Sequence, residues 1–100
     1  MIWRILFGNI HKVRYVYILF LANGQIYTGK TDDLRRRMLE HERGSVTSTA
    51  RRRPVRLIGY EAYSQPSDAD RREKFLKTTE GKRLFRQQYR DILAVMNKSE

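Results

Sequence analysis

Residues 14–29, RYVYILFLANGQIYTG, constrain the fold of this 100-residue chain more than any other segment. The first half alternates and is rich in Val, Ile, Tyr and Phe, which is typical of a β-strand. The ANG triplet at positions 22–24 then turns the chain, and residues 25–29 bring it back. The segment therefore predicts a β-hairpin, and with it an antiparallel sheet.

Two loop lengths fit this turn, and they give opposite predictions for Tyr17 and Tyr27. A two-residue Asn-Gly turn pairs Tyr17 with Lys30 and puts the two tyrosines on opposite faces. A three-residue loop, with Gly24 in the left-handed position, pairs Tyr27 with Leu19 and puts both tyrosines on one face. We favour the three-residue loop, because it leaves the other face uniformly apolar. That apolar face consists of Val16, Ile18, Phe20 and Ile26.

Downstream of the hairpin, capping residues and hydrophobic periodicity predict a third strand and further helices. The order β-β-α-β-α-α is that of an α+β domain, a three-stranded antiparallel sheet flanked by helices. We expect residues 14–96 to form the domain and residues 1–13 an N-terminal arm or an extra strand. The predicted elements are a helix from residues 31–33 to about Arg43, a strand over residues 55–63, a helix from the turn at residues 64–67 to about Lys77, and a helix over residues 80–96.

Two of the predicted helices carry polar groups on the face that helical spacing turns inward. The helix that ends near Arg43 continues its thin apolar stripe through Arg37 and His41. The helix that ends near Lys77 places Glu73 among apolar neighbours. Ionisable groups on an inward face are unusual, so these positions are candidates for a functional site.

The charge balance favours a polyanionic partner. The chain has 21 Lys and Arg against 11 Asp and Glu, a formal net charge of +10. Nucleic acid is the commonest partner for such an excess on a small domain. We expect the basic loop residues Arg51, Arg52 and Arg53 to contact phosphates, which would position a duplex without reading its sequence.

Other compositional features exclude several classes of protein. The chain has no cysteine, so it has neither a disulfide framework nor a thiolate metal site. The apolar start, residues 1–12, is too short to span a bilayer and lacks a small-residue cleavage site. We therefore expect a cytoplasmic protein with no membrane partner.

Six residues each have a reason to lie near one surface of this domain. Taken singly, each has a purely structural explanation, because strand tyrosines usually pack and surface arginines usually keep their charge in water. Taken together, they supply a carboxylate for a divalent metal, cations for phosphate, and a phenol or imidazole for proton transfer. These groups suit the cleavage of a phosphodiester. They are Tyr17, Tyr27, Lys30, Arg37, His41 and Glu73.

The same residues stand in an order that resembles the GIY-YIG nuclease domain family. YVY (15–17) and YTG (27–29) match its two half-motifs, with Tyr-Val in place of Gly-Ile and Thr in place of Ile. Arg37 follows where the family has its arginine, and RREKFLK (71–77) resembles the segment with its metal-binding glutamate. The resemblance covers residues 14–90. It is greatest to small stand-alone bacterial members, which are similar to the N-terminal nuclease domain of the excision-repair incision subunit.

The resemblance implies a metal-dependent endonuclease that hydrolyses DNA phosphodiester bonds, with a link to DNA repair. It implies a single Mg²⁺ or Mn²⁺ held by Glu73, and Tyr17 as the general base on the attacking water. The pKa of a free phenol is about 10, so Lys30 and the metal would have to lower the pKa of Tyr17. Arg37 would stabilise charge on the phosphate. The implied catalytic set is Tyr17, Tyr27, Lys30, Arg37 and His41.

An alternative from another class is a non-catalytic nucleic-acid-binding module with a nuclease fold. The filled catalytic positions count against this alternative, since a degenerate member is expected to have lost one of them. The sequence leaves the substrate open: branched DNA, damaged DNA and RNA all fit. It also leaves open a protein partner that supplies specificity, because the chain has no room for a separate recognition domain.

Overall fold

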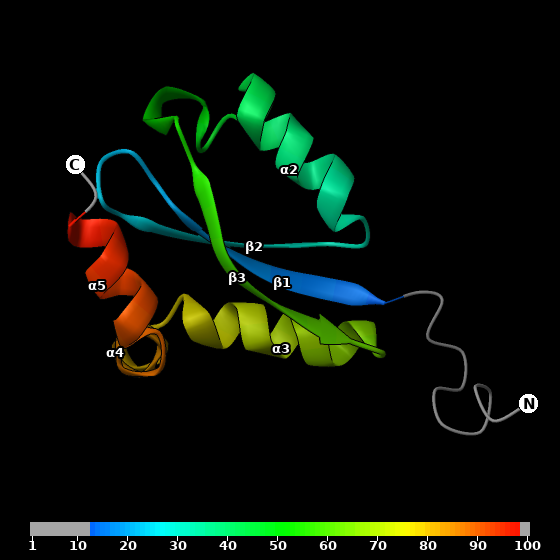
Figure 1. Cartoon of the computed structure of the whole chain (residues 1–100). Helices are drawn as coiled ribbons and strands as arrows, with labels where there is room; N and C mark the ends of the chain where they lie inside the picture. The colour runs from blue at the N-terminus through cyan, green and yellow to red at the C-terminus, as the bar shows by residue number, and fades with distance from the viewer. Residues whose placement is uncertain (1–12, 99–100) are drawn as a thin grey trace, which may run out of the picture.

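The computed structural model describes residues 13–98 and has the predicted α+β architecture (Figure 1). A three-stranded antiparallel sheet has the order β2-β1-β3, so β1 is central and the other two strands are edges. The arm predicted for residues 1–13 lies outside the described residues except for Val13. The strands are β1 (Arg14–Phe20), β2 (Ile26–Thr31) and β3 (Arg56–Tyr63).

The register of the hairpin confirms the three-residue loop. Tyr27 pairs with Leu19, and Tyr17 pairs with Gly29, so both tyrosines lie on one face of the sheet. Gly24 has a φ of 84°, the left-handed conformation that glycine adopts without a steric penalty. Its N–H donates to the carbonyl of Leu21 at 2.9 Å, which closes the turn.

Each face of the sheet has its own core, as the alternation predicts. On one face, Tyr17 and Leu19 are buried beneath α2 (Leu34–Arg43), which contributes Leu34 and Met38. On the other face, Val16 and Ile18 pack against three helices (Figure 1). These helices are α3 (Pro66–Leu76), α4 (Thr79–Gln88) and α5 (Arg90–Lys98).

Helix α2 begins and ends at capping residues close to the predicted positions. The side chain of Asp33 accepts a hydrogen bond from the backbone N–H of Arg36 at 3.0 Å, which satisfies a free donor of the first turn. The helix ends at Gly44, whose φ is 82°. These caps fix the position of the helix above the sheet, and with it the positions of the side chains it projects inward.

The last predicted helix, residues 80–96, is instead two helices with a break at Tyr89. Tyr89 has φ −106° and ψ 22°, outside the helical range. Its ring stacks on Phe85 with centroids 4.2 Å apart and lies over Gly59 of β3, where a Cβ would approach Cε2 of Tyr89 to 2.5 Å. Contact with β3 therefore fixes the position of Tyr89. Helix α5 follows, and its Leu93 is buried in the core.

The predicted basic loop between α2 and β3 is partly packed. Val46 and Thr49 are buried, and a single turn of 3₁₀ helix, η2 (Ala50–Arg52), follows them. Within residues 13–98, no helix is both long enough and apolar enough to cross a membrane.

Candidate active site

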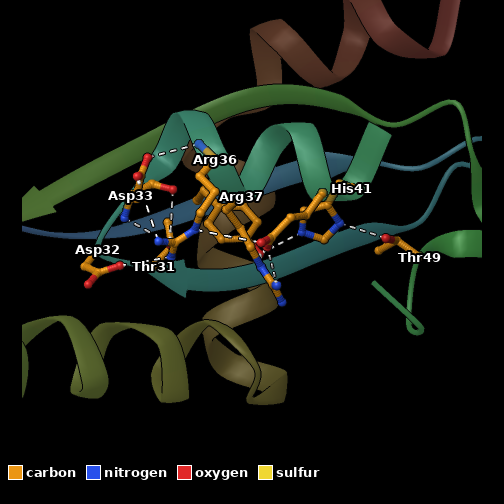
Figure 2. A network of polar contacts seen from close by, with 9 residues as sticks. Thr31, Asp32, Asp33, Arg36, Arg37, His41 and Thr49 are labelled. Carbon is orange, nitrogen blue, oxygen red and sulfur yellow. Dashed lines mark hydrogen bonds and ion pairs between the residues drawn. The ribbon is translucent and has the colours of Figure 1, made fainter. Parts of the chain in front are cut away.

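Tyr17 is at the centre of a buried polar network. It stands in the middle of the central strand, and only 1% of the residue is exposed. Its phenolic oxygen lies 2.8 Å from Nε2 of His41 and accepts a hydrogen bond from Nε of Arg37 at 3.3 Å. Arg37 and His41 are one turn apart on α2, and both project toward the sheet (Figure 2). Two elements thus converge on one oxygen atom.

His41 is fully buried and has a partner at each ring nitrogen. Nδ1 lies 2.7 Å from Oγ1 of Thr49, which is also fully buried (Figure 2). A neutral imidazole has one donor and one acceptor nitrogen. Because Arg37 donates to the Tyr17 oxygen, the Tyr17 hydroxyl is free to donate to Nε2, and Nδ1–H then donates to Thr49. This assignment uses every partner in the chain of hydrogen bonds.

Burial shifts the pKa values of both ends of the Tyr17–His41 pair. Loss of hydration raises the pKa of Tyr17 to about 12, against a smaller lowering by Arg37. Burial also lowers the pKa of His41, which keeps the imidazole neutral near pH 7. The expected lowering of the Tyr17 pKa by Lys30 is not found, because Lys30 lies on the other face of the sheet and pairs with Asp70 at 2.5 Å.

Arg37 is held between two oxygen acceptors. Its Nη1 donates to Oε1 of Glu40 at 2.9 Å while Nε donates to Tyr17. The hydrogen bond with Tyr17, followed by that with Glu40, raises the pKa of the guanidinium, which stays charged. The side chain is one-third exposed, at 33%. Arg37 can therefore contact the phenol on one side and an anion from solvent on the other.

Tyr27 lines the same site through its ring. Its centroid is 6.3 Å from that of Tyr17 and 5.4 Å from that of His41, with the His41 contact edge-to-face. Gly29, two residues further along β2, faces Tyr17, and a Cβ there would lie 2.4 Å from the phenolic oxygen. The glycine of the YTG segment therefore provides the room in which the Tyr17 hydroxyl sits.

The remaining predicted residues, Lys30 and Glu73, form a second group on the opposite face of the sheet. The Lys30 ammonium lies 3.8 Å from Oε1 of Glu73 and bridges to Asp70, one turn earlier on α3. Lys77 approaches Oε2 of Glu73 at 3.2 Å. The prediction that all six residues share one surface needs correction: the two groups lie on either side of the edge strand β2, where Gly29 and Lys30 are neighbours.

Glu73 has the oxygen ligands that a hard divalent cation requires. Its side chain is 15% exposed and presents carboxylate oxygens, which suit Mg²⁺ or Mn²⁺. Among residues 13–98, no group of three or more His, Cys, Asp or Glu could hold a metal ion. Glu73 therefore fits as a single anchor for an ion whose other ligands are water and phosphate oxygens, provided that a lysine gives way.

The predicted phosphate contacts in the basic loop differ in their surroundings. The guanidinium of Arg53 donates to the backbone carbonyls of Ala50 and Glu42, each at 3.0 Å. Arg52 donates to the carbonyl of Ser48 at 3.3 Å. Arg51 is exposed. Arg53 thus ties the loop to the end of α2, whereas Arg51 is the member best placed to meet a phosphate.

Sequence comparison agrees with this geometry. The family model of the GIY-YIG catalytic domain matches residues 13–89. The chain belongs to the GIY-YIG family. Membership implies a nuclease domain, and the matched range includes Tyr17, Tyr27 and Arg37.

Several bacterial UPF0213 proteins are similar to this chain. A UPF0213 protein of Lacticaseibacillus paracasei is 41% identical over 59 residues, which are 58% of this chain and 66% of that one, just under two thirds of its length. A UPF0213 protein of Staphylococcus saprophyticus is 37% identical over 65 residues, 64% of this chain and 79% of that one. The solution NMR structure of a UPF0213 protein from Bacillus halodurans superposes with a TM-score of 0.51 at 33% identity, over 76% of this chain and 84% of that one. These names state no activity.

Three polar partners in this GIY-YIG site were missed from the sequence. Glu40 lies three residues after Arg37, a helical spacing at which ion pairs form, so the pattern could have indicated it. Asp70, on α3, pairs with Lys30 of β2, so no helical spacing could have indicated it. Thr49 gives no such signal, because it reaches His41 only through the fold of the loop after α2.

Proposed function

We propose that this chain is a metal-dependent endonuclease that hydrolyses DNA phosphodiester bonds in the cytoplasm. The observation that supports it best is the pair of contacts at the Tyr17 oxygen, which meets the cationic Arg37 and the neutral imidazole of His41. A purely structural tyrosine needs only one hydrogen-bond partner when buried. A hydrogen-bond donor, Arg37, and an acceptor, His41, at the same oxygen suit an atom that loses and gains a proton.

In the proposed reaction, Tyr17 takes a proton from the attacking water while its own proton passes to Nε2 of His41. The water O–H bond breaks, a bond forms between the water oxygen and phosphorus, and the bond between phosphorus and the leaving oxygen breaks; that oxygen leaves with the bonding electrons and takes a proton from solvent. A phenol whose pKa is about 12 is a strong base once deprotonated but is rarely ionised near pH 7. Transfer to His41 in the same step avoids the need for a free phenolate.

Arg37 and Tyr27 would act on the phosphate rather than on the proton. Arg37 stays charged beside Tyr17 and has an exposed side from which it would stabilise charge developing on the phosphate oxygens. Tyr27, with its ring against His41, would position the phosphate or the attacking water. Removing a charge-stabilising donor of this kind usually lowers kcat by about 10²–10³-fold.

Glu73 would hold the single divalent ion, Mg²⁺ or Mn²⁺, with water and phosphate oxygens as the other ligands. A bound ion of this kind would polarise the phosphate and help the leaving oxygen depart. The two lysines that face Glu73 keep its carboxylate in place before the ion arrives. Lys30 would then lose Glu73 as a partner, stay paired with Asp70, and contact the phosphate.

The proposal includes the partners and the process implied by the family. DNA is the proposed substrate, in branched or damaged form, with a role in repair. RNA remains a second substrate to test. A protein partner that supplies specificity also remains to be tested. A cleavage screen over branched, nicked, single-stranded and duplex substrates would identify the preferred one.

The second candidate function is a non-catalytic nucleic-acid-binding module. Two observations favour it: lysine ammonium groups face both oxygens of Glu73, and the pKa of Tyr17 is raised rather than lowered. In this reading Glu73 is a structural ion-pair partner and Tyr17 a satisfied core residue.

Plasmid nicking with Mg²⁺ and with EDTA separates the two candidates. The endonuclease proposal predicts nicking with Mg²⁺ only, and its loss in Glu73→Gln, which keeps the size of the side chain but not the charge that binds the ion. DNA binding by Glu73→Gln should be unchanged or tighter, because a negative charge is removed. Binding without nicking in the wild type would favour the non-catalytic module.

A further inference from the structure

A groove lies along the free edge of the sheet, between β2 and the helices α3 and α4. Its volume is about 390 Å³, within the range of ligand-binding clefts. The floor is apolar and the rim is basic, a combination that differs from the polar network around Tyr17. Its lining includes the apolar residues Ile26 and Phe85, the cations Lys77, Lys82 and Arg86, and Tyr27.

The two cations contributed by α4 are available for an external anion. Lys82 and Arg86 are exposed and one helical turn apart. Neither forms an ion pair with another residue in the described part of the chain, whereas their neighbour Arg83 is paired with Glu80 at 2.5 Å. Unpaired cations that line one groove attract a polyanion.

The groove is continuous with both parts of the candidate active site. Tyr27 lines the groove and also contacts His41 through its ring, with centroids 5.4 Å apart. Lys77 lines the groove and lies 3.2 Å from Glu73. The groove therefore lies beside residues 25–28 at the start of β2, next to residues 29 and 30 that separate the Tyr17 group from the Glu73 group, and it extends along α4.

The chemistry of the groove suits a sugar-phosphate chain better than a small anion. Lys82 and Arg86 are separated by about 6 Å along the helix axis, so they would meet neighbouring phosphates rather than the same one. Within residues 13–98, β2 is an edge strand, so it also presents backbone N–H groups that have no partner strand in this part of the chain. Sugars and bases would lie on the apolar floor, the usual combination in grooves that bind a single strand.

We propose that this groove binds the strand of nucleic acid on one side of the reacting phosphate, with Lys82 and Arg86 contacting its phosphates. The position of the reacting phosphate rests on the proposed function. The groove thus adds a nucleic-acid contact at the edge of the sheet beside β2 to the one expected of Arg51 in the loop of residues 51–53, where Arg53 is engaged with backbone carbonyls.

The test is a double variant, Lys82→Ala with Arg86→Ala, against a charge-matched control. The control is Arg35→Ala with Arg56→Ala, since Arg56 lies in the opposite edge strand and Arg35 lines a hollow beside Leu57 of that strand. Lys77 is left unchanged because it pairs with Glu73. Fluorescence anisotropy with a labelled thymidine oligonucleotide, in EDTA and over a range of KCl, measures binding without cleavage. Melting temperatures check the fold of each variant.

The groove variant should bind roughly tenfold more weakly near 0.1 M salt, and the slope of log K against log[salt] should flatten by about 1.4, the value for two single-strand phosphates. The control should keep most of the affinity and the slope. Equal weakening of both variants would overturn the groove and leave the endonuclease proposal standing. Failure of the wild type to bind any oligonucleotide would overturn both proposals. Equally strong binding of a polyglutamate peptide would overturn the assignment to nucleic acid.

Discussion

The phenolic oxygen of Tyr17 lies 2.8 Å from Nε2 of His41, and neither residue is more than 1% exposed. A buried hydrogen bond of this kind fixes the relative position of the two rings. The second partner of His41, Thr49, extends the connection from the central strand through α2 to the following loop. Tyr17, His41 and Thr49 are therefore part of the core, whereas Arg37 and Tyr27 are partly exposed to solvent.

Tyr17→Phe should reduce the free energy of unfolding by about 1–3 kcal/mol, the usual effect of leaving buried partners without a hydrogen bond. Removal of the hydroxyl deprives both Nε of Arg37 and Nε2 of His41 of a partner. Urea unfolding measures the change. Tyr27→Phe is the matched control, since Tyr27 is only half-buried and should lose less. Equal stability of both variants would contradict the buried hydrogen bond at Tyr17.

Thr49→Val should impair the positioning of His41, because it replaces the hydroxyl partner of Nδ1 with a methyl group of similar size. The hydrogen bond at one ring nitrogen determines which nitrogen carries the proton. We expect the ¹⁵N chemical shifts of His41 to report a mixture of tautomers and cleavage to fall roughly tenfold, less than the ~10²–10⁴-fold that positioned proton transfer contributes, because His41 is misplaced and not removed. Thr49→Ser restores the hydroxyl and should restore both readouts. Normal shifts in Thr49→Val would exclude a positioning role.

Acid should destabilise the fold through His41. Burial lowers the pKa of His41 in the folded state, whereas the unfolded chain takes up a proton near pH 6.5. Below that pH the unfolded state binds more protons, so the free energy of unfolding falls as the pH falls. Between about pH 7 and pH 5, above the titration range of carboxylates, the free energy of unfolding of His41→Gln should change less with pH than that of the wild type. Parallel curves would mean that His41 does not contribute.

Arg53→Ala and Arg51→Ala should separate a structural arginine from a binding one. Arg53 donates to the carbonyls of Ala50 and Glu42, so its loss should lower the melting temperature. Arg51→Ala removes the same charge from an exposed position and should leave the melting temperature within error while weakening DNA binding modestly. The two melting curves and anisotropy titrations check this. A stable Arg53→Ala variant with weakened binding would reverse the assignment.

The parts of the fold that follow from local rules were predictable from the sequence. The hairpin has only two registers, and only one of them gives a uniformly apolar face, so the pairing of Tyr17 with Gly29 followed. The ends of α2 followed from Asp33 and Gly44, whose capping preferences are strong. The inward position of Glu73 followed from helical spacing.

The parts that depend on tertiary contact were not predictable. The break at Tyr89 arises from contact with Gly59 on β3, which no local pattern encodes. Thr49 meets His41 through a loop whose path the sequence does not specify. The separation of Lys30 from Tyr17 was within reach, because neighbouring residues of a strand point to opposite faces, and Lys30 directly follows Gly29.

Single-turnover cleavage by Tyr17→Phe, beside Tyr27→Phe and Arg37→Ala, tests the catalytic role of Tyr17 most directly. Rates are measured with Mg²⁺ at temperatures well below each melting point, so that stability does not limit them. If Tyr17 exchanges the proton with water, its Phe variant should cleave roughly 10²-fold more slowly or worse. Tyr27→Phe should lose less, and Arg37→Ala should be nearly inactive. Cleavage at the wild-type rate by Tyr17→Phe would contradict the account and leave Tyr17 as a packed core residue.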